Sequence, residues 1–404
     1  MRILLVSQYY YPESFPSTLI AEELVRRGHQ VDVLTGKPNY GFEHPPKEYD
    51  SINQEERHGV HIYRVKLHKR KKGVFSLIRN YLSFWRNSKR FLKKCRNQYD
   101  LVYGFNFSPI MSLDGAGRFA KKRRLPFVIH VFDLWPESVL ATGMTKKNSL
   151  FYKFLYRLSK KIYDRANLFL LSSPGFKDYF TNVLKIDKPT ILTYQPISED
   201  ERDFSNPFKE EEKSLVYCGN IGKVQNLAPF ISAFSLLPKD SPYSFYVIGE
   251  GSEKEKMLSL VRSLSLENKV FFLGRLSPEE ALPYRRHAYM NVVSLEKGNG
   301  YVSKTIPTKL LASLEDARPI LASVGEDGAK MLEEAGGSFL VDPIKESVLS
   351  ALEKASSLSE NELRLMGERN KKYYDEHLSS KHVMDIIEDA LKEETNRAKK
   401  QPSY

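Results

Sequence analysis

Short apolar runs rich in branched side chains alternate with longer segments of helical periodicity along most of the chain. The first run, Met1–Val6, precedes a loop and then a segment whose apolar residues recur every three or four positions. Such runs are typical of buried parallel strands, and the periodic segments are typical of the helices that connect them. Further runs of this kind occupy residues 31–35, 101–104, 127–131, 168–172, 214–217, 244–248, 270–272, 290–293 and 319–322. The pattern predicts an α/β protein with doubly wound parallel sheets.

A polar, acidic stretch divides this alternation into two halves. Residues 196–212 carry Pro207 and several acidic side chains, which indicates a linker. We therefore expect one Rossmann-like domain at 1–195 and a second at 213–375. Residues 376–404 are predicted to form a helix that crosses back to the N-terminal domain, followed by a charged tail. Because open α/β sheets bind ligands at the carboxyl ends of their strands, we expect the two domains to face each other across a cleft.

The composition is that of a globular protein of two domains. Of 404 residues, 41% are hydrophobic and 28% charged, which excludes a disordered or fibrous chain. The two cysteines, Cys95 and Cys218, lie far apart in the sequence. This spacing disfavours a disulfide framework or a cysteine zinc site and favours a reducing, cytoplasmic setting. No run of about 18 apolar residues occurs, so we expect no membrane-spanning segment.

Positive charge is concentrated in one segment. Residues 1–190 contain 34 Lys and Arg against 16 Asp and Glu, whereas residues 191–404 contain 28 against 34. Arg64–Arg96 alone holds 13 basic residues and no acidic residue, which exceeds the net charge of +12 for the whole chain. This basic segment therefore makes the protein cationic.

Apolar and cationic positions interleave within the basic segment at helical spacing. Phe75, Ile78, Leu82 and Trp85 form one stripe, and arginine and lysine side chains lie beside it. Such a helix can dock on an anionic bilayer, because aromatic rings enter the headgroup layer while cations meet lipid phosphates. It can equally pack its apolar face on its own domain, and both interpretations can hold. A cationic segment also attracts nucleic acid, but no nucleic-acid-binding motif accompanies it, and we expect no such partner.

A turn with two glycines follows the predicted strand at 214–217. Its residues are Gly219, Asn220, Ile221 and Gly222, and a helical segment comes next. Glycines let the backbone approach a bulky anion, and a helix N-terminus offers free N–H groups. The turn is a candidate phosphate site; the alternative is that the glycines only permit a tight connection.

A second loop of this kind enters a helix near Pro307. Lys304 and Thr305 precede the helix, and Lys309 lies within it. Two ammonium groups and several hydroxyls at a helix N-terminus suit a diphosphate, whose charge grows as its bond to a sugar breaks. The alternative is an ordinary solvated helix start with surface lysines. Because both loops occupy equivalent places in one predicted sheet, each supports the other as part of an anion site.

Titratable side chains follow the predicted strand at 127–131. His130, Asp133 and Glu137 lie near the carboxyl end of that sheet, where catalytic groups of α/β proteins gather. The alternatives are that His130 is a satisfied core residue and that Asp133 caps a turn. Trp135 suits either the core or a sugar-stacking surface.

Taken together, these segments resemble a known family. The stretches that carry the resemblance are, in chain order, SQYYYPES, GHQVDVLTGKPNY, HVFDLWPES, YCGNIGKVQNL and SKTIPTKLLASLEDARPILAS. They are similar to glycosyltransferase family 4, which has the GT-B fold of two Rossmann-like doubly wound domains facing across a cleft. The similarity extends over nearly the whole chain and points to the bacterial branch that builds capsule, O-antigen and other surface polysaccharides. Members of that branch often transfer N-acetylated amino sugars.

The resemblance implies a metal-independent, retaining transfer from a nucleotide-activated sugar, usually UDP-linked, to an acceptor on the N-terminal domain. No cofactor is implied besides the UDP-sugar co-substrate. The catalytic residues expected from it are Asp133 and Lys304. The expected donor-binding residues are Gly219, Asn220, Ile221, Gly222, Arg275, Thr305, Lys309 and Glu315. On the acceptor side we expect Glu13, Ser14, His130 and Glu137.

The chain departs from the family pattern in its second domain. Most members carry two glutamates separated by seven residues there, and the second glutamate holds the ribose hydroxyls. Lys304 and Ala312 occupy these places. Lysine is usual at the first place in this branch, whereas alanine is unusual at the second, and Glu315 is a candidate substitute one helical turn away. The arginine and lysine common in the first donor loop are replaced by Asn220 and Gln225.

We therefore expect a cytoplasmic glycosyltransferase, peripheral at the inner face of the plasma membrane, that extends a lipid-linked saccharide. Its expected partners are the nucleotide-sugar donor, the lipid-linked acceptor and an anionic membrane surface contacted through Arg64–Arg96. Two alternatives stay open. One is a catalytically degenerate scaffold of the same fold, for which Ala312 argues, and the other is a hydrolase or epimerase of nucleotide sugars. The concentrated positive charge favours the transferase.

Overall fold

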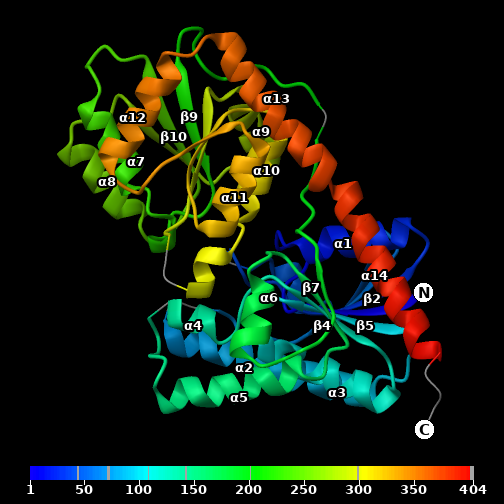
Figure 1. The fold of residues 1–404 in the computed structure, drawn as a ribbon. Coiled ribbons are helices and arrows are strands. Elements are labelled where there is room, and N and C mark those ends of the chain that lie inside the picture. The colour runs from blue at the N-terminus through cyan, green and yellow to red at the C-terminus, as the bar shows by residue number, and fades with distance from the viewer. Residues whose placement is uncertain are drawn as a thin grey trace. The chain divides into compact units, whose positions relative to one another are not determined.

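The computed structural model describes residues 1–42, 45–70, 73–107, 109–141, 143–200, 202–297 and 300–400. Within it the chain divides into two compact units (Figure 1). Unit 1 comprises Met1–Ser198 and Ser380–Tyr404, and unit 2 comprises Glu199–Ser379. Parts of segments named above lie outside the described residues, namely Lys71 and Lys72 of the basic segment, Glu201 of the predicted linker, and residues 401–404 of the charged tail.

Unit 1 is built on an eight-stranded sheet in the order β3-β4-β2-β1-β5-β6-β7-β8. Neighbouring strands are parallel except for the antiparallel pair of β3 and β4. The strands are β1 (Arg2–Val6), β2 (Gln30–Gly36), β3 (Gln54–Arg57), β4 (Val60–Val65), β5 (Leu101–Asn106), β6 (Phe127–Val131), β7 (Leu168–Leu171) and β8 (Thr190–Leu192). The runs predicted as strands in this half are confirmed. The sequence pattern missed β3, β4 and β8, because short or half-exposed strands carry no continuous apolar run.

Helices cover both faces of this sheet, as the alternation predicted. The helices of unit 1 are α1 (Pro16–Arg26), α2 (Val74–Lys94), α3 (Asp114–Arg123), α4 (Glu137–Ala141), α5 (Leu150–Tyr163), α6 (Phe176–Asp178) and α14 (Ser380–Lys400), with shorter turns η1 (Lys47–Asp50), η2 (Ile110–Leu113) and η3 (Tyr179–Val183). One core joins β1, β2 and β5 to α1 and α14, and its members include Leu5, Leu24, Ile387 and Leu391.

The last helix of the chain returns to the first sheet. Its apolar side is buried in the core of unit 1, and its polar side is bonded to the turn after α1. There Arg27 lies 2.6 Å from Asp385 and 3.0 Å from Glu388, and His29 lies 2.9 Å from Glu388. α14 is therefore an integral part of unit 1 (Figure 1).

Unit 2 is built on a six-stranded parallel sheet in the order β11-β10-β9-β12-β13-β14. Its strands are β9 (Lys213–Cys218), β10 (Tyr243–Ile248), β11 (Val270–Gly274), β12 (Met290–Ser294), β13 (Ile320–Ser323) and β14 (Ser338–Leu340). Its helices are α7 (Ala228–Ala233), α8 (Lys254–Ser263), α9 (Pro278–His287), α10 (Thr308–Glu315), α11 (Glu326–Ala335), α12 (Lys345–Ser356) and α13 (Glu360–His377), with turns η4 (Lys223–Gln225), η5 (Phe234–Leu236) and η6 (Gly300–Lys304). The predicted strands are again confirmed, and only the three-residue strand β14 was missed.

In a parallel sheet, the loops that follow the strands all lie at the same edge, the carboxyl edge. In unit 2 the loops after β9, β10, β11 and β12 all leave from the carboxyl edge, and in unit 1 those after β1, β2, β5 and β6 do so. The candidate residues other than Glu315 and His130 lie on or near these loops, so residues distant in the chain lie at the same edge of their sheet.

A buried carboxylate anchors α2 to the rest of unit 1. Asp114, at the start of α3, accepts a hydrogen bond of 2.9 Å from the indole N–H of Trp85. Its oxygens also lie 2.6 Å from Arg165, 3.0 Å from Arg118 and 3.1 Å from Lys89. Burial acts to raise the pKa of this carboxyl, but the indole and the three cations outweigh burial and hold the pKa well below its usual value.

We expect the Asp114→Asn substitution to destabilise unit 1 by about 3 kcal/mol at neutral pH, because it removes the buried carboxylate that pairs with Arg165, Lys89 and Arg118. Urea unfolding followed by tryptophan fluorescence measures this, since Trp85 and Trp135, the two tryptophans of the chain, both lie in unit 1. The control is Asp164→Asn, whose carboxylate is 46% exposed in its pair with Lys160. That change should cost no more than about 0.5 kcal/mol, and equal costs for the two variants would contradict the anchor.

Candidate functional site

The loops at the carboxyl edge of unit 2 are packed backbone to backbone. After β9, Gly219 has a φ of +150°, and the N–H of Ile221 donates to the carbonyl of Glu250 at 2.9 Å. A Cβ at Gly249 would lie 1.9 Å from the carbonyl oxygen of Gly219, and one at Gly251 would lie 2.1 Å from that of Ile221. Only glycine fits at these two contacts, so the loop after β10 supports the turn after β9 with no side chain between them.

Lys309, in the first turn of α10, connects the two predicted anion loops. Its ammonium donates to the hydroxyl of Tyr217 at 2.6 Å and lies 4.3 Å from the centre of that ring. A Cβ at Gly219 would lie 3.1 Å from the same nitrogen. The hydroxyl of Tyr217 in turn donates to the carbonyl of Asn220 at 2.5 Å. Burial lowers the pKa of Lys309 to about 7.

Lys304 and Thr305 lie in the connection that leads into α10. Both are half-buried, at and just after the end of η6. The same connection packs against the turn after β13, where a Cβ at Gly325 would lie 1.8 Å from the carbonyl oxygen of Ser303. Close packing therefore fixes the backbone beside Lys304 at the same edge of the sheet as Lys309.

Two polar residues close the turn after β9 where the family pattern has cations. The side-chain oxygen of Gln225 accepts from the backbone N–H of Gly222 and from the amide of Asn220, both at 3.1 Å. Next to the turn is a hollow of about 200 Å³, lined by Ile221, Gly222, Lys223, Asn226, Leu227, Ala228, Glu253, Lys256, Met257 and Glu296. With Asn220 and Gln225 at these positions, the turn lacks the two cations of the family pattern and is held instead by hydrogen bonds between its own residues.

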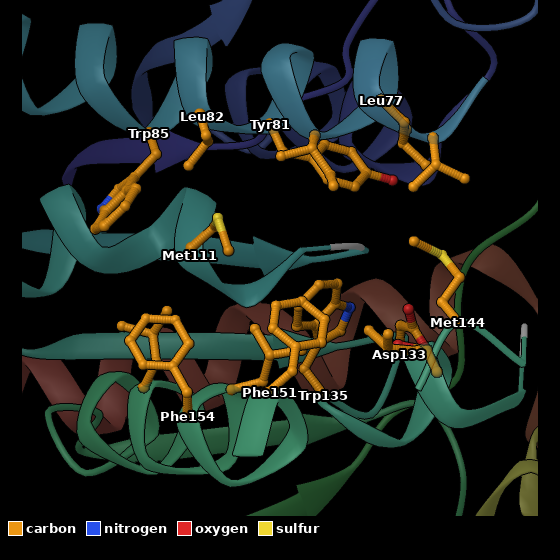
Figure 2. Close-up of a pocket in the computed structure, with 16 residues that line it drawn as sticks. Leu77, Tyr81, Leu82, Trp85, Met111, Asp133, Trp135, Met144, Phe151 and Phe154 are labelled. Carbon is orange, nitrogen blue, oxygen red and sulfur yellow. The ribbon is translucent and has the colours of Figure 1, made fainter. Parts of the chain in front are cut away.

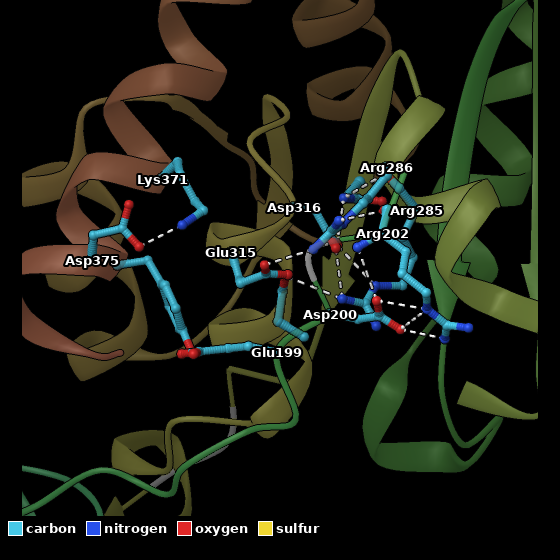
Figure 3. Close-up of polar contacts among 12 residues, drawn as sticks. Glu199, Asp200, Arg202, Arg285, Arg286, Glu315, Asp316, Lys371 and Asp375 are labelled. Atoms are coloured by element: carbon cyan, nitrogen blue, oxygen red, sulfur yellow. Dashed lines mark hydrogen bonds and ion pairs between the residues drawn. The ribbon is translucent and has the colours of Figure 1, made fainter. Parts of the chain in front are cut away.

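Arg275 and Glu315, the other donor-side residues expected from the sequence, have different surroundings. Arg275 is exposed and directly follows β11, at the carboxyl edge. Glu315 is buried at the far end of α10, where its carboxylate lies 2.8 Å from Arg286. In the same cluster Arg285 lies 2.7 Å from Asp316 (Figure 3).

The position of Glu315 corrects the expectation that it replaces the missing ribose-binding glutamate. It follows Lys309 by six residues, so it lies roughly 9 Å further along the helix axis, away from the anion loops. Burial raises the pKa of its carboxyl, and Arg286 opposes that shift. The structure therefore places Glu315 in a structural ion-pair cluster and not with the donor-side residues.

Glu13, on the acceptor side, holds two loops of unit 1 together. Its buried carboxylate accepts hydrogen bonds from the backbone N–H groups of Asn39 at 2.8 Å, Tyr40 at 2.5 Å and Tyr10 at 3.4 Å. These residues lie in the loops that follow β1 and β2. Burial raises the pKa of Glu13 to about 7 against the opposing effect of the backbone N–H groups. Ser14, beside it, is exposed.

The loop after β6 carries Asp133 and Glu137. Asp133 is half-buried, and its N–H donates to the carbonyl of Asn106 at 3.1 Å. Glu137 begins α4 and accepts a hydrogen bond of 2.7 Å from the hydroxyl of Tyr152 on α5. Both carboxylates thus lie at the carboxyl edge of the first sheet, as predicted.

His130 lies in the core and corrects a second expectation. Its ring is fully buried, stacks on Phe132 at 4.1 Å and shares a hydrogen bond of 2.8 Å with the hydroxyl of Tyr103. Burial lowers its pKa to about 3, so the imidazole is neutral at physiological pH. A buried side chain in the interior of a strand offers no atom to an acceptor, and the core interpretation of His130 holds.

The described helices include none long and apolar enough to cross a bilayer. Over the same ranges, His, Cys, Asp and Glu side chains form no group of three or more that could hold a metal ion.

Two family comparisons match most of the chain. Residues 18–193 match the Glycosyl transferase 4-like domain, and residues 198–374 match Glycosyl transferases group 1. The chain belongs to glycosyltransferase family 4. The first matched region lies within unit 1 and leaves out β1 and α14, and the second corresponds closely to unit 2 without the last residues of α13.

Curated relatives of this family-4 chain are bacterial. A probable glycosyltransferase, WbjE of Pseudomonas aeruginosa, is 25% identical over 226 residues, which are 52% of this chain and 54% of that one. N-acetylgalactosamine-N,N'-diacetylbacillosaminyl-diphospho-undecaprenol 4-alpha-N-acetylgalactosaminyltransferase of Campylobacter jejuni is 32% identical over 132 residues, which are 31% and 34% of the two chains. The matches thus span about half the length of the first relative and a third of the second.

Solved structures share the fold over nearly the whole chain. Sucrose-phosphate synthase of Thermosynechococcus elongatus has a TM-score of 0.74 at 14% identity, covering 97% of this chain and 98% of that one. WaaG, a glycosyltransferase involved in lipopolysaccharide biosynthesis, has a TM-score of 0.70 at 15% identity, covering 96% and 99%. HepE of Anabaena in complex with UDP has a TM-score of 0.71 at 13% identity, covering 97% and 100%. These likenesses establish the GT-B fold of the family-4 chain.

Sequence reasoning missed the partners that position its predicted residues. The sequence pattern places Tyr217 where a strand meets the glycine turn but does not indicate that it orients Lys309, and it does not single out the loop of Gly249 and Gly251. A signal is present in the sequence, because Gly249 and Gly251 directly follow a predicted strand, as Gly219 and Gly222 do.

The pKa of Glu13 predicts a pH dependence of stability. The carboxyl titrates near 4.5 when the chain is unfolded and near 7 when it is folded, so its contribution to stability is complete below pH 4.5 and is lost as the pH rises through 7. Relative to Glu13→Gln, the wild type should lose about 1.4 kcal/mol per pH unit within this window. Urea unfolding followed by tryptophan fluorescence at several pH values measures the difference.

The control for that measurement is Glu48→Gln, which alters an exposed carboxyl in η1. Its stability relative to the wild type should stay level over the same window. A difference between wild type and Glu13→Gln that grows in favour of the wild type as the pH rises would show that the backbone N–H groups dominate and would refute the prediction.

Proposed function

We propose that this chain transfers a sugar from a nucleotide-activated donor, held by unit 2, to a lipid-linked saccharide, held by unit 1. The contact of Lys309 with Tyr217 and the turn at Gly219 carries the proposal, because it gathers a cation and close-packed backbone at one sheet edge. Such an edge suits a diphosphate. Family membership supports transfer as the reaction class.

The identities of donor and acceptor rest on the relatives. The Anabaena structure contains UDP, which supports a UDP-linked donor. The name of the Campylobacter enzyme specifies transfer of N-acetylgalactosamine to a saccharide on diphospho-undecaprenol. We accordingly propose a UDP-linked N-acetylated amino sugar as donor, a lipid-linked saccharide as acceptor, and bacterial surface polysaccharide as the pathway.

The proposed reaction retains the anomeric configuration and uses no metal. The bond between the sugar and the diphosphate breaks as the acceptor hydroxyl attacks from the same face, and the hydroxyl proton passes to the departing phosphate. Lys304 and Lys309 stabilise the negative charge that grows on the leaving group. The turn 219–222 and Thr305 surround the diphosphate, Arg275 lies toward the nucleobase, and Asp133 lies at the reacting centre on unit 1.

A catalytically degenerate scaffold is the second candidate. Ala312 occupies the place of the ribose-binding glutamate, and Glu315 is committed to Arg286. A scaffold of this kind keeps the fold but has lost the hydrogen bonds that a nucleotide requires. Binding of UDP therefore separates the two candidates.

We expect wild-type protein to bind UDP and transfer sugar, and Lys309→Gln to weaken UDP binding about 10- to 100-fold, because a buried charge-assisted hydrogen bond is lost. Since Lys309 has a pKa of about 7 in the empty site, the affinity of the wild type should fall as the pH rises from 7 to about 8.5, whereas that of the variant stays level. Calorimetry with UDP and transfer to a polyprenyl-diphosphate saccharide measure both effects.

The matched control is Lys330→Gln, an exposed lysine on α11 that should leave UDP binding and transfer unchanged. Wild-type protein that binds no UDP would favour the scaffold. Release of free sugar without transfer would identify a hydrolase instead.

We also propose that the protein associates peripherally with an anionic membrane, which the positive charge of unit 1 supports. Arg86 and Arg90 on α2 are exposed, so we expect Arg86→Gln with Arg90→Gln to reduce binding to anionic vesicles about 30-fold, at roughly 1 kcal/mol for each cation. Sedimentation with phosphatidylglycerol vesicles at rising salt measures the binding, and salt should release the wild type. The control is Lys354→Gln with Lys372→Gln on unit 2, which should bind as the wild type does. Equal binding of wild type to neutral vesicles would exclude the electrostatic contribution.

A further inference from the structure

An apolar groove of about 540 Å³ runs through unit 1 between α2 and α5. Figure 2 shows α2 on one side and α5 on the other, with Met111 between them. Trp85 and Phe154 lie toward one end, and Asp133 and Met144 lie toward the other (Figure 2). We call this cavity the α2–α5 groove.

Both helices present large apolar side chains to solvent along the rim of the groove. Ile78 and Leu82 on α2 are 38% and 43% exposed, and Phe151 and Phe154 on α5 are 49% and 58% exposed. A contiguous apolar surface of this kind on a soluble domain marks a binding site. The four side chains line one cavity, so a single apolar ligand can cover them together.

Polar anchors on the inner sides of the helices keep the groove open. Asn80, on the buried face of α2, accepts from Gln8 at 2.9 Å and donates to Asn39 at 2.9 Å. Trp85 is held by Asp114, as described above, and α5 is held through the hydrogen bond of Tyr152 to Glu137. Moving the helices together would break these buried hydrogen bonds, which is costly.

The lining of the groove selects for a hydrocarbon chain over a peptide. Its polar atoms belong to Tyr81, Asp133, Ser138 and the two indole rings, and its remaining side chains are aliphatic, aromatic or thioether. A peptide inserted here would bury backbone N–H and C=O groups with few partners, whereas a hydrocarbon chain has no hydrogen bonds to satisfy.

Exposed cations follow the apolar rim on both helices. Arg86 and Arg90 lie one and two turns beyond Leu82 on α2, and Lys153, Arg157 and Lys161 repeat every four residues on α5. Neither 74–94 nor 143–163 contains an acidic residue. Positive charge also lies close in the chain to Met144, at the Asp133 end, as exposed Lys146 and Lys147. Lys146 and Lys147 complement a phosphate on a hydrocarbon chain whose polar end lies toward Asp133, whereas Arg86 and Arg90 lie toward the opposite, Trp85 end.

We infer that the α2–α5 groove holds the hydrocarbon chain of the phosphate-bearing lipid acceptor, drawn out of the bilayer, with its polar end toward Asp133. The inference rests on the proposed function for the identity of the lipid, and it adds a chain-binding site within unit 1. The groove then contributes to acceptor affinity in proportion to the hydrocarbon it buries. Each CH₂ within the groove should raise affinity roughly fourfold until the groove is filled.

The two tryptophans of the chain make the test direct. Trp85 and Trp135 both line the groove, so intrinsic fluorescence reports on this cavity. The probe is ω-bromododecyl phosphate, used as a monomer below its micellar concentration, because bromine quenches an indole only near contact. We expect saturable quenching, displacement by unbrominated dodecyl phosphate, weaker binding of the octyl compound, and no quenching or displacement by inorganic phosphate.

Matched variants separate the groove from the outer surface of α5. Phe154→Asn changes a side chain of the rim, and Leu150→Asn changes one that is 84% exposed and lies one turn away outside the lining. Neither substitution alters charge. Phe154→Asn should weaken the bromododecyl phosphate about tenfold, whereas Leu150→Asn should bind it as the wild type does. Leu82→Asn and Phe75→Asn form the same pair on α2, and circular dichroism checks that each variant folds.

Absence of quenching by the monomer, equal effects of the paired variants, or affinity independent of chain length would overturn the inference. Quenching seen only with vesicles of brominated phospholipid would overturn it too, because the rim would then contact only the bilayer surface. Chain binding without sugar transfer would leave the groove standing and refute the proposed function. Sugar transfer without chain binding would refute the groove alone.

Discussion

The hydrogen bond from the ammonium of Lys309 to the hydroxyl of Tyr217 holds two loops of unit 2 together at one edge of its sheet. The hydrogen-bond partner of Lys309 is a neutral hydroxyl, and burial lowers the pKa of the lysine to about 7. A cation in such surroundings has lost hydration without gaining a carboxylate, so an anion arriving beside it recovers that free energy. In the proposed function the anion lies at the turn of Gly219, because the same nitrogen lies next to its backbone.

Backbone contact is the second constraint on this edge of unit 2. Gly249 and Gly251 bring one loop against the carbonyls of the next, at separations that no Cβ permits. Gln225 closes the turn with two hydrogen bonds where the family pattern has a cation. The proposed site therefore combines a rigid backbone with few charged side chains. Lys304 and Lys309 are its main cations, whereas the family pattern has further cations in the first loop. Ala312 also removes a charged side chain of the family pattern, the second glutamate, and the nearby Glu315 is paired with Arg286.

In unit 1, α2 packs one face on the domain and presents another to the groove and to solvent, so the prediction that it packs on its own domain is confirmed. Asn80, Phe84, Ser88 and Leu92 recur every four residues and pack on the domain, while the stripe that includes Ile78 and Leu82 faces the groove and solvent. Hydrogen bonds also hold α2 to the rest of the unit. Asn80 bonds to Gln8 and Asn39, and the indole of Trp85 donates to Asp114. This arrangement leaves Ile78 and Leu82 facing the groove and solvent, and it explains why an amphipathic helix here is both anchored and exposed.

The sequence by itself determined the parts of this protein that depend on short-range pattern. Continuous apolar runs identified ten of the strands, because a strand buried on both faces needs no information from its neighbours. The short or half-exposed strands β3, β4, β8 and β14 were missed, since their pairing depends on the sheet that receives them. The same logic applied to the site: glycine turns and lysines near helix starts were visible as residue types, and so was the concentration of charge in Arg64–Arg96.

Only the tertiary structure decided which of these residues meet. It joined Lys309 to Tyr217 across 92 positions, enclosed His130 among aromatic rings, and turned Glu315 toward Arg286. It also paired α2 with α5, whose separate apolar stripes gave no indication of a shared groove. Side-chain partners are set by the packing of distant elements, and local periodicity records which face is apolar without recording what that face will contact.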